Sequence, residues 1–324
     1  MKIVQTEALG PFENYKLIEA PDLTPRPGEV IIKVAAVSLG YADGLMAAGL
    51  YQVKPPVPYT PATDLAGTVV AVGDGVDAGL MGARVMGQGF HALAEMARLQ
   101  ARTLSRLPAG VTFEGASVLP TNYATALHAL KDRGNLQPGE RLLVLGAAGG
   151  VGSAAVDLGV LMGAEVIACA SSEEKRQFAL ARGAKAVIDT ELEGWRDRLK
   201  AAADGKGPDV IYDPVSGPLF EPAFRSIAWK GRHLVIGFVG GPIPALPTNL
   251  PLLKGAALVG VDIRQFGIFE PALARANLDQ LLAWQAEGRL APAVGKVFAL
   301  EDFAAALEHA MSGQGTGKTV VKIG

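Results

Sequence analysis

The sequence contains one cysteine, Cys169, among 324 residues. A single thiol excludes an intrachain disulfide and any metal site built from several cysteines. The chain has no run of Lys or Arg and its net charge is −2, so nothing indicates a nucleic-acid partner or an anionic membrane surface. No continuous apolar run approaches the roughly 20 residues that span a bilayer, and residues 1–15 lack the apolar centre of a signal peptide. These absences predict a cytoplasmic protein that acts on neither nucleic acid nor membranes.

Aromatic residues are also scarce, at 6%, and charged residues make up only 19% of the chain. Hydrophobic residues make up 49%, a balance that excludes a disordered chain and supports extensive buried cores. At roughly 100–200 residues per domain, the length fits about two domains.

The first zone, from residue 1 to about 118, is rich in Gly, Pro and short β-branched runs. The clearest runs are VIIKVAAVSL (30–39), DLAGTVVAVG (64–73) and ARVMGQG (83–89). Short strands separated by turn residues indicate a mostly β domain, shaped as a barrel or a sandwich. Four prolines in VKPPVPYTPATD (53–64) predict a rigid irregular loop there.

The second zone, from about 120 to 262, alternates strands with helices. Helices are predicted at 152–163 and 172–183, and 255–262 is a candidate sixth strand after five others. The five strands are predicted at 141–146, 165–170, 186–189, 209–213 and 233–237. Continuous apolar strands that alternate with helices predict a parallel sheet covered on both faces.

The last zone, from about 263 to 324, has two helical patterns, at 274–289 and 302–313, and a final strand at 318–323. A strand after a nucleotide-type domain predicts that the chain returns to the first domain.

The strongest local signal is the segment 142–175, where an apolar strand runs into a glycine turn, a helix and a second strand. The turn residues are Ala147, Ala148, Gly149, Gly150, Val151 and Gly152. This is the dinucleotide-binding pattern G-x-G-x-x-G with Ala147 at the first glycine. Gly149 would let the backbone approach a pyrophosphate, Gly152 would let the helix pack on the strand, and the helix N-terminus would attract the phosphates. The alternative is a glycine turn that merely closes an ordinary strand–helix unit.

The end of the second strand indicates which dinucleotide is bound. NAD enzymes place Asp or Glu there to hold the ribose hydroxyl, whereas this chain has Ala170. The residues that follow are Ser171, Ser172, Glu173, Glu174, Lys175 and Arg176. Hydroxyls and cations without a carboxylate at the strand tip favour NADPH over NADH. The alternative is that Lys175 and Arg176 form a solvated helix face paired with the two glutamates.

Six blocks, in order and spacing along the whole chain, resemble the quinone oxidoreductases of the medium-chain dehydrogenase/reductase superfamily, relatives of zeta-crystallin. The blocks are PPVPYTPATDLAGTVVAVGDGV (55–76), VLPTNYATALHAL (118–130), VLGAAGGVG (144–152), VIYDPVSG (210–217), GRHLVIGF (231–238) and TGKTVVKIG (316–324). The resemblance implies a GroES-like, mostly β catalytic domain (1–120 and 263–324) and an inserted Rossmann domain with a doubly wound parallel sheet (121–262). It also implies an active site in the cleft between them and a homodimer joined through edge strands near 255–262.

The resemblance also assigns roles to individual residues. Tyr51, Asp43 and Thr63 are implied on the catalytic side, although Tyr51 could equally be a core tyrosine. The cofactor side combines the turn residues Ala147 and Gly149 to Gly152 and the tip residues Ser171, Ser172 and Lys175 with a nicotinamide set. That set comprises Thr121, Thr125, Asp213, Pro214, Val215, Gly237 and Phe238. Two positions depart from the family: Gly40 often corresponds to Asn, and Thr190 often to Tyr, which leaves fine specificity open.

Zinc ligands of the alcohol-dehydrogenase branch are absent from the two regions that would carry them, Ser38–Asp43 and Ala62–Asp64. Because a catalytic zinc needs about three such ligands, we predict no metal, and a packing role for Cys169. None of the four histidines has a partner that the sequence identifies, so His128, His233 and His309 are interpreted as structural or solvent-facing. His91, after a glycine-rich turn, stays a minor catalytic candidate.

Without zinc, no Lewis acid polarises a simple ketone, so hydride must pass to an acceptor that is already electrophilic. The sequence therefore predicts NADPH-dependent reduction of a quinone. One alternative is reduction of the C=C bond of an enone or enoyl thioester. Another is a protein that binds NADPH without catalysis.

Overall fold

The computed structural model describes residues 1–324, and the chain divides into two compact units. Unit 1 comprises residues 1–121 and 278–324, and unit 2 comprises residues 122–277. None of the helices combines the length and the apolar composition that crossing a membrane requires.

Unit 1 is built on a largely antiparallel sheet that contains the β-branched runs seen in the sequence. Its strand order is β14-β15-β3-β4-β5-β7, and β6 also pairs with β3. The strands are β3 (Glu29–Leu39), β4 (Asp64–Val72), β5 (Arg84–Gln88), β6 (Met96–Gln100), β7 (Ser105–Arg106), β14 (Val294–Ala299) and β15 (Lys318–Lys322), beside a separate pair, β1 (Lys2–Gln5) and β2 (Lys16–Glu19). The GroES-like, mostly β architecture is thereby confirmed.

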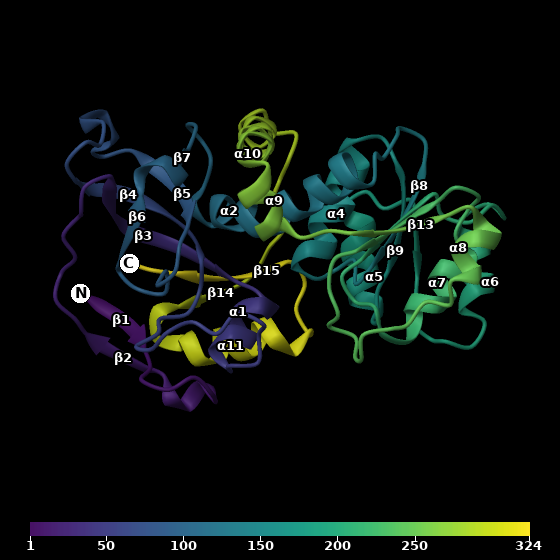
Figure 1. Ribbon diagram of the computed structural model, residues 1–324, viewed down its shortest axis with the longest axis horizontal. Coiled ribbons are helices and arrows are strands. Elements are labelled where there is room, and N and C mark those ends of the chain that lie inside the picture. The colour runs from purple at the N-terminus through teal and green to yellow at the C-terminus, as the bar shows by residue number, and fades with distance from the viewer. The chain divides into compact units, whose positions relative to one another are not determined.

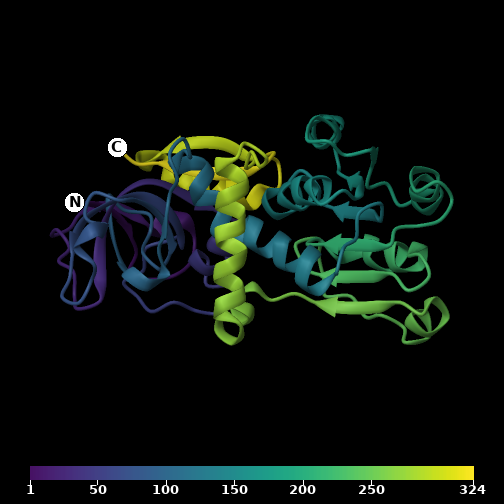
Figure 2. The same ribbon diagram turned by 90° about the horizontal axis from the view of Figure 1, so that it is seen from above.

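The last strand returns to the first domain, as predicted. Strand β15 pairs antiparallel with β3, with Val320 opposite Ser38, and Figure 2 shows the yellow C-terminal segment beside the purple N-terminal part of unit 1. Helices α1 (Tyr41–Ala47) and α11 (Phe303–Ser312) pack against each other in this unit. The proline-rich loop has no regular secondary structure up to residue 63, and β4 begins at Asp64.

A continuous helical segment runs from residue 113 to residue 133. It consists of α2 (Phe113–Val118), wider turns over Leu119–Tyr123, α3 (Ala124–Leu127) and wider turns over His128–Arg133. The segment begins at Phe113 because Thr112 caps it: the Thr112 Oγ1 accepts a hydrogen bond from the Gly115 N–H at 3.1 Å. Pro120, which has no N–H to donate, lies within the wider turns.

Unit 2 is a parallel sheet of six strands in the order β10-β9-β8-β11-β12-β13. All five predicted strands are present, and the candidate sixth strand forms the edge beside β12. The strands are β8 (Arg141–Leu145), β9 (Glu165–Cys169), β10 (Ala186–Ile188), β11 (Val210–Asp213), β12 (Arg232–Val235) and β13 (Ala257–Gly260). This order is that of a doubly wound Rossmann sheet, and Figure 1 shows its strands among the teal and green helices.

Helices cover both faces of this sheet, as continuous apolar strands require. On one face, α4 (Gly150–Leu161) lies so close that a Cβ on Gly159 would be 2.6 Å from Leu142. On the other face, α6 (Trp195–Ala202) and α7 (Phe220–Ser226) share an apolar cluster with Leu143 and Ile211. The remaining helices are α5 (Glu173–Ala181), α8 (Asn249–Lys254), α9 (Ile263–Phe269) and α10 (Pro271–Ala286), the last seen lengthwise in Figure 2.

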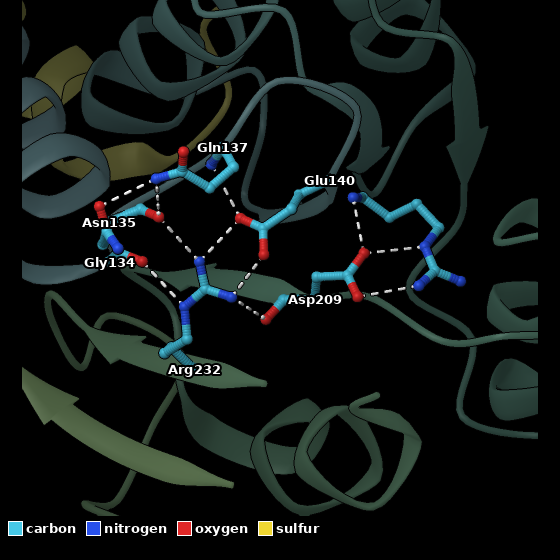
Figure 3. A network of polar contacts seen from close by, with 7 residues as sticks. Gly134, Asn135, Gln137, Glu140, Asp209 and Arg232 are labelled. Carbon is cyan, nitrogen blue, oxygen red and sulfur yellow. Dashed lines mark hydrogen bonds and ion pairs between the residues drawn. The ribbon is translucent and has the colours of Figure 1, made fainter. Parts of the chain in front are cut away.

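Two ion pairs connect the amino ends of the neighbouring strands β8, β11 and β12 (Figure 3). Arg232, at the start of β12, contacts both carboxylate oxygens of Glu140 at 2.7 Å. Arg141, at the start of β8, contacts both oxygens of Asp209, at 2.8 and 2.9 Å. These bidentate contacts lie at the opposite end of the strands from the glycine turn, so they support the sheet without occupying the nucleotide end.

The division between the units falls at residues 277 and 278, within α10, rather than near residue 263 where the sequence placed it. Side-chain contacts explain the difference. The rings of His128 and Phe266 stack with centroids 3.7 Å apart, and Asn277 bonds to both Lys131 and Asp132 at 2.9 and 2.8 Å. Residues 263–277 therefore belong with unit 2.

Candidate functional site

The turn between β8 and α4 has the geometry that the glycine pattern indicates. Gly146 adopts the left-handed conformation with φ of 61°. A Cβ on Gly152 would lie 2.1 Å from the carbonyl oxygen of Gly146, so close contact with the turn itself requires glycine there. A Cβ on Gly149 would meet only that same oxygen, at 3.5 Å. Packing within the chain therefore leaves space at Gly149, and glycine there keeps the backbone open to a ligand.

Helix α4 begins at this turn with its first backbone N–H groups directed out of the helix. Gly149 is the extended N-cap residue, and it is exposed, whereas Ala147 is fully buried. The buried methyl group of Ala147 is accommodated, which explains why alanine can replace the first glycine of the pattern. Val151 and Gly150 are partly buried in the first turn, which carries no acidic residue. A helix of 12 residues with this N-terminus favours an anion.

The tip of β9 brings hydroxyls and a cation together. Ser172 caps α5 by accepting the Lys175 N–H at 3.3 Å, and the Lys175 Nζ lies 3.5 Å from the Ser171 Oγ. Arg176 is engaged elsewhere, because it donates to the carbonyl of Ala170 at 3.1 Å and pairs with Glu173 at 2.9 Å. Of the two cations, the structure thus sets Lys175 beside the serines.

The carboxyl ends of β11 and β12 carry the residues expected around the nicotinamide. Phe238 is 44% exposed and Val215 is partly buried, and a Cβ on Gly237 would lie 3.0 Å from the carbonyl oxygen of Pro214. The Asp213 side chain, by contrast, is fully buried and hydrogen bonds occupy both of its oxygens. Its carboxylate therefore acts on the loop that follows β11, and offers no open surface for a ligand.

Unit 1 buries two carboxylates, those of Asp43 and Asp64, at 7% and 2% exposure. Asp43 lies in the first turn of α1 and accepts the Gly40 N–H at 2.7 Å. Burial raises the pKa of Asp43 to about 6, opposed by the charge of Lys318 and assisted by that of Asp64. Burial likewise raises the pKa of Asp64, against the opposing effects of Lys318 and of hydrogen bonds from Thr121 and Gln88.

Asp64 and Gln88 hold Thr121, a residue that the resemblance assigns to the nicotinamide. The Thr121 N–H donates to the Asp64 Oδ2 at 3.1 Å. The Gln88 Nε2 bridges the Asp64 Oδ1 and the Thr121 Oγ1, each at 3.0 Å. The Thr121 side chain also hydrogen bonds to the Asp64 carboxylate, so Asp64 and Gln88 together fix the orientation of the hydroxyl group. Strands β4 and β5 set this arrangement, since Asp64 and Gln88 are directly opposite in their ladder.

Lys318 is buried at the start of β15 and explains the glycine at position 40. A Cβ on Gly40 would lie 2.6 Å from the Lys318 Nζ, so any larger residue would displace the ammonium group from its place near Asp43. Sequence reasoning selected Asp43 but missed Asp64, Gln88 and Lys318. A lysine directly before the run TVV (319–321) was the one signal that the sequence offered.

The other candidate residues are less closely bound into this network. Thr63 is partly buried and its Oγ1 lies 3.4 Å from the Asp64 Oδ1. Tyr51 is partly buried, and its ring packs against the apolar core of unit 1. Thr125 is buried at 6% exposure, four positions after Thr121 in the helical segment.

Three of the four histidines have polar partners that sequence did not reveal. The nearest contacts are His128 Nδ1 to Asp132 at 3.0 Å, His233 Nε2 to Asp213 at 2.9 Å and His309 Nδ1 to Thr319 at 2.9 Å. These contacts fit the structural role predicted for the three histidines, although the sequence could not identify the partners. His91 is exposed, with its ring 6.4 Å from that of Tyr59.

Cys169 ends β9 inside the apolar cluster of unit 2. Its Sγ lies 3.3 Å from the carbonyl oxygen of Asp189, and burial raises its thiol pKa to about 12. A fully buried thiol that stays protonated is not a nucleophile, which agrees with the packing role expected for it.

A dinucleotide turn at the end of the first strand of a doubly wound sheet, combined with a GroES-like unit, defines a nicotinamide-dependent oxidoreductase. Family models agree: residues 26–129 match the alcohol dehydrogenase GroES-like domain, and residues 150–277 match the zinc-binding dehydrogenase family. The second description names zinc. However, no group of three or more His, Cys, Asp or Glu side chains in the structure could hold a metal ion, so the residues do not fit one.

Similar proteins identify the family to which this oxidoreductase belongs. The chain is 36% identical to "Quinone oxidoreductase-like protein 2" of Rattus norvegicus over 93% of its length and 88% of the relative. The solved quinone oxidoreductase from Thermus thermophilus, described together with its NADPH complex, is 32% identical with a TM-score of 0.85 over 99% of this chain and 100% of that one. The CurK enoyl reductase is 26% identical with a TM-score of 0.88 over 100% and 99%. The protein belongs to the quinone oxidoreductase family of medium-chain dehydrogenases/reductases.

Proposed function

We propose that the protein is an NADPH-dependent quinone reductase that works without a metal. The observation that carries the choice of NADPH is the tip of β9, where the Lys175 Nζ lies 3.5 Å from the Ser171 Oγ and Ala170 replaces the usual carboxylate. A 2′-phosphate adds negative charge at this point, and a cation beside hydroxyls is suited to hold it. The NADPH complex of the Thermus thermophilus relative supports the same choice.

The glycine turn would hold the pyrophosphate of the dinucleotide. Gly149 leaves its backbone uncovered, and the N-terminus of α4 supplies N–H donors and the positive end of the helix dipole. Val215, Gly237 and Phe238 at the carboxyl ends of β11 and β12 would contact the nicotinamide. NADPH, when bound, supplies the hydride that reduces the acceptor.

Unit 1 would orient the acceptor and stabilise charge that develops on it. Hydrogen bonds with Gln88 and Asp64 fix the Thr121 side chain, which would contact the nicotinamide. Asp43, with a pKa raised to about 6 by burial, is close to the pH range in which a carboxyl group can exchange a proton. Lys318 is a buried cation near the same carboxylate, and its positive charge limits how far the pKa of Asp43 rises.

Tyr51 is the proposed hydrogen-bond donor to the acceptor oxygen. A quinone can take its protons from solvent, whereas an enone needs its oxyanion stabilised at the moment of hydride transfer. Tyr51→Phe is therefore expected to slow enone reduction more than quinone reduction. Unchanged turnover with both acceptors would show that Tyr51 is only a core residue.

A second candidate function is reduction of the C=C bond of an enone or enoyl thioester. The similarity to the CurK enoyl reductase favours it, and it shares the fold, the cofactor and the hydride geometry. In both functions the acceptor is electrophilic by itself, which suits a set of residues that does not fit a metal.

One assay separates these functions. Oxidation of NADPH by the purified protein is followed by the absorbance of the reduced nicotinamide, with a naphthoquinone and a 2-enal or enoyl thioester side by side and NADH as control. Fast NADPH-linked reduction of the quinone alone supports the proposal. Preference for the enal or thioester would assign the protein to C=C reduction, and no turnover with either would contradict both functions.

We also propose a homodimer joined through β13, the edge strand of unit 2. The apolar side chain of Leu258 in this strand is 44% exposed. Leu252 and Leu253 in the preceding helix α8 are 79% and 67% exposed. An edge strand with apolar side chains is a natural template for pairing with a second copy. Sedimentation equilibrium of the protein and of Leu258→Lys tests it, since the charge should shift the population to monomer.

A further inference from the structure

The buried pair of Asp213 and His233 connects the ends of two strands in unit 2. The His233 Nε2 lies 2.9 Å from the Asp213 Oδ2, and both side chains have no exposed surface. Asp213 is the last residue of β11, and His233 lies in β12 opposite Ile211, so the imidazole reaches along the sheet toward its carboxyl edge. Because a carboxylate only accepts, this contact places the imidazole proton on Nε2.

The other oxygen of Asp213 fixes the loop that follows β11. The Asp213 Oδ1 accepts the Val215 N–H at 2.9 Å and the Ser216 N–H at 2.6 Å. Ser216 is fully buried with φ of 57° and ψ of −127°, a conformation that a residue with a Cβ rarely adopts. Such strain persists only where the surroundings hold it, and it is commonest where a backbone must be positioned for function.

The strained residue in turn holds the end of the next strand. The Ser216 Oγ donates to the carbonyl of Gly237 at 3.0 Å, and the Gly240 N–H donates to the carbonyl of Val215 at 2.8 Å. Gly217 permits this approach, because a Cβ there would lie 2.4 Å from the Gly240 carbonyl oxygen. Loop 213–217 and loop 237–240 therefore form one connected structure at the carboxyl edge of the sheet.

Aromatic packing leaves the His233 ring little freedom. The Phe220 and Phe224 rings of α7 lie with centroids 4.7 and 5.9 Å from the imidazole. Its Nδ1 is buried without a hydrogen-bond partner, so the contact with Asp213 is the one polar restraint on the ring.

We propose that His233 is a positioning residue for the nicotinamide half of the cofactor. It orients Asp213, Asp213 holds Ser216 in its strained conformation, and Ser216 fixes Gly237. This inference rests on the proposed function, in which Val215, Gly237 and Phe238 contact the nicotinamide. The adenosine half would bind at the glycine turn and the β9 tip. Gly146 of the turn lies close to Val215, since a Cβ on Gly146 would be 2.7 Å from the Val215 Cγ2. However, no residue of the turn or the tip takes part in the hydrogen bonds that link His233 to Gly237, so we expect His233 to act on the nicotinamide end of the ligand.

The test compares equilibrium binding of NADPH with that of adenosine 2′,5′-bisphosphate, which lacks the nicotinamide. His233→Leu is expected to weaken NADPH binding about tenfold, the effect of one lost hydrogen bond of ordinary strength, and to leave bisphosphate binding unchanged. His233→Gln keeps an N–H donor at a similar reach and is expected to restore NADPH binding. Ser216→Ala, which removes only the bond to Gly237, is expected to weaken NADPH binding selectively even if His233→Leu does not fold.

Phe224→Leu is the matched control, because it alters packing on the same ring without touching the loop. It is expected to lower the melting temperature and to weaken neither ligand selectively. Equal weakening of both ligands in His233→Leu and Ser216→Ala, or no weakening, would overturn the positioning role. Failure of the unaltered protein to bind NADPH would instead overturn the proposed function, and this inference with it.

Discussion

Gly152 lies so close to Gly146 that a Cβ atom on residue 152 would be 2.1 Å from the Gly146 carbonyl oxygen. At Gly149 the same atom would be 3.5 Å from that oxygen, an ordinary contact. The absence of a side chain therefore serves a different purpose at each of these two positions of the motif. Gly152 is required by packing within the chain, whereas Gly149 leaves space that the chain does not fill.

Alanine at each position should separate stability from binding. Gly152→Ala must shift the turn away from α4, so we expect a loss of about 1–3 kcal/mol in the free energy of unfolding, measured by urea denaturation. Gly149→Ala should unfold at nearly the wild-type denaturant concentration but bind NADPH at least about tenfold more weakly, because the methyl group would block backbone approach to a phosphate. Normal NADPH affinity in Gly149→Ala would contradict the assigned phosphate site.

Lys175 should decide the preference for NADPH over NADH. Lys175→Ala removes the cation beside Ser171, and a charged hydrogen bond to a phosphate contributes roughly 1.5–3 kcal/mol. We expect kcat/KM for NADPH to fall about tenfold or more, while kcat/KM for NADH stays the same. Lys200→Ala, which changes an exposed lysine of α6, is the control for loss of charge alone. A parallel fall with both cofactors would mean that Lys175 does not recognise the 2′-phosphate.

Asp43 should make stability depend on pH in a direction opposite to that of a salt-bridged carboxylate. Its pKa is about 6 in the folded protein, against an ordinary value of 3.8. The ionised form at neutral pH therefore weakens folding, and stability from this group increases as pH falls through 6 toward 3.8. Between about pH 7.5 and about pH 5 this amounts to about 1–2 kcal/mol.

Asp43→Asn removes this dependence. The free energy of unfolding of the variant minus that of the unaltered protein is measured by urea denaturation at about pH 7.5 and at about pH 5. We expect this difference to be about 1–2 kcal/mol more favourable to the variant at the higher pH. Asp74→Asn, which changes an exposed turn residue of unit 1, is the control. Equal differences at the two pH values would show that Asp43 titrates normally.

The contribution of Glu140 to stability should fall as the pH falls, the opposite of the trend for Asp43. Partial burial would raise its pKa, but hydrogen bonds from Arg232 and from the Gln137 N–H outweigh it and hold the pKa below its usual range. Its contribution is present above the ordinary carboxyl pKa and is lost as pH falls through the lowered value. Glu140→Gln should lower the free energy of unfolding at neutral pH by about 1–2 kcal/mol, since it breaks a bidentate pair.

The exposed pair of Glu221 and Arg225 provides the comparison for that change. Both side chains are 43% exposed, so Glu221→Gln should alter stability by less than about 0.5 kcal/mol. If the two variants lost the same amount, the network at the amino ends of the strands (Figure 3) would have no special role in the sheet.

Much of the fold was predictable because local pattern and burial agree. Each strand of unit 2 is a short apolar run flanked by turn residues, and each is present with bounds within about two residues of the prediction. The start of the helical segment at Phe113 was not predicted, because the single threonine cap at Thr112 is a weak signal when Pro120 follows eight residues later. The association of residues 263–277 with unit 2 was missed as well, since it depends on contacts such as that between His128 and Phe266.

The candidate site divides in the same way. The glycine turn and the hydroxyl and cationic residues after β9 are contiguous in sequence, because one strand–turn–helix unit builds them, and they could be predicted directly. Asp64, Gln88 and Lys318 are separated by 24 residues and more, and no spacing rule connects them. The structure shows that these three residues are brought together through burial and hydrogen bonds. Their action on the cofactor or the acceptor is part of the proposed function.

The amino-acid sequence by itself determined the fold class and the kind of cofactor turn, because hydrophobic period and small residues at a turn act locally, and the resemblance of six blocks indicated the family. Only the tertiary structure decided which polar groups are buried together. The pairing of β4 with β5 brings Gln88 to Asp64, and the parallel register of β11 and β12 brings His233 to Asp213. Most buried polar groups are paired, and for these residues the partner is fixed by strand register in space, which sequence distance does not reveal.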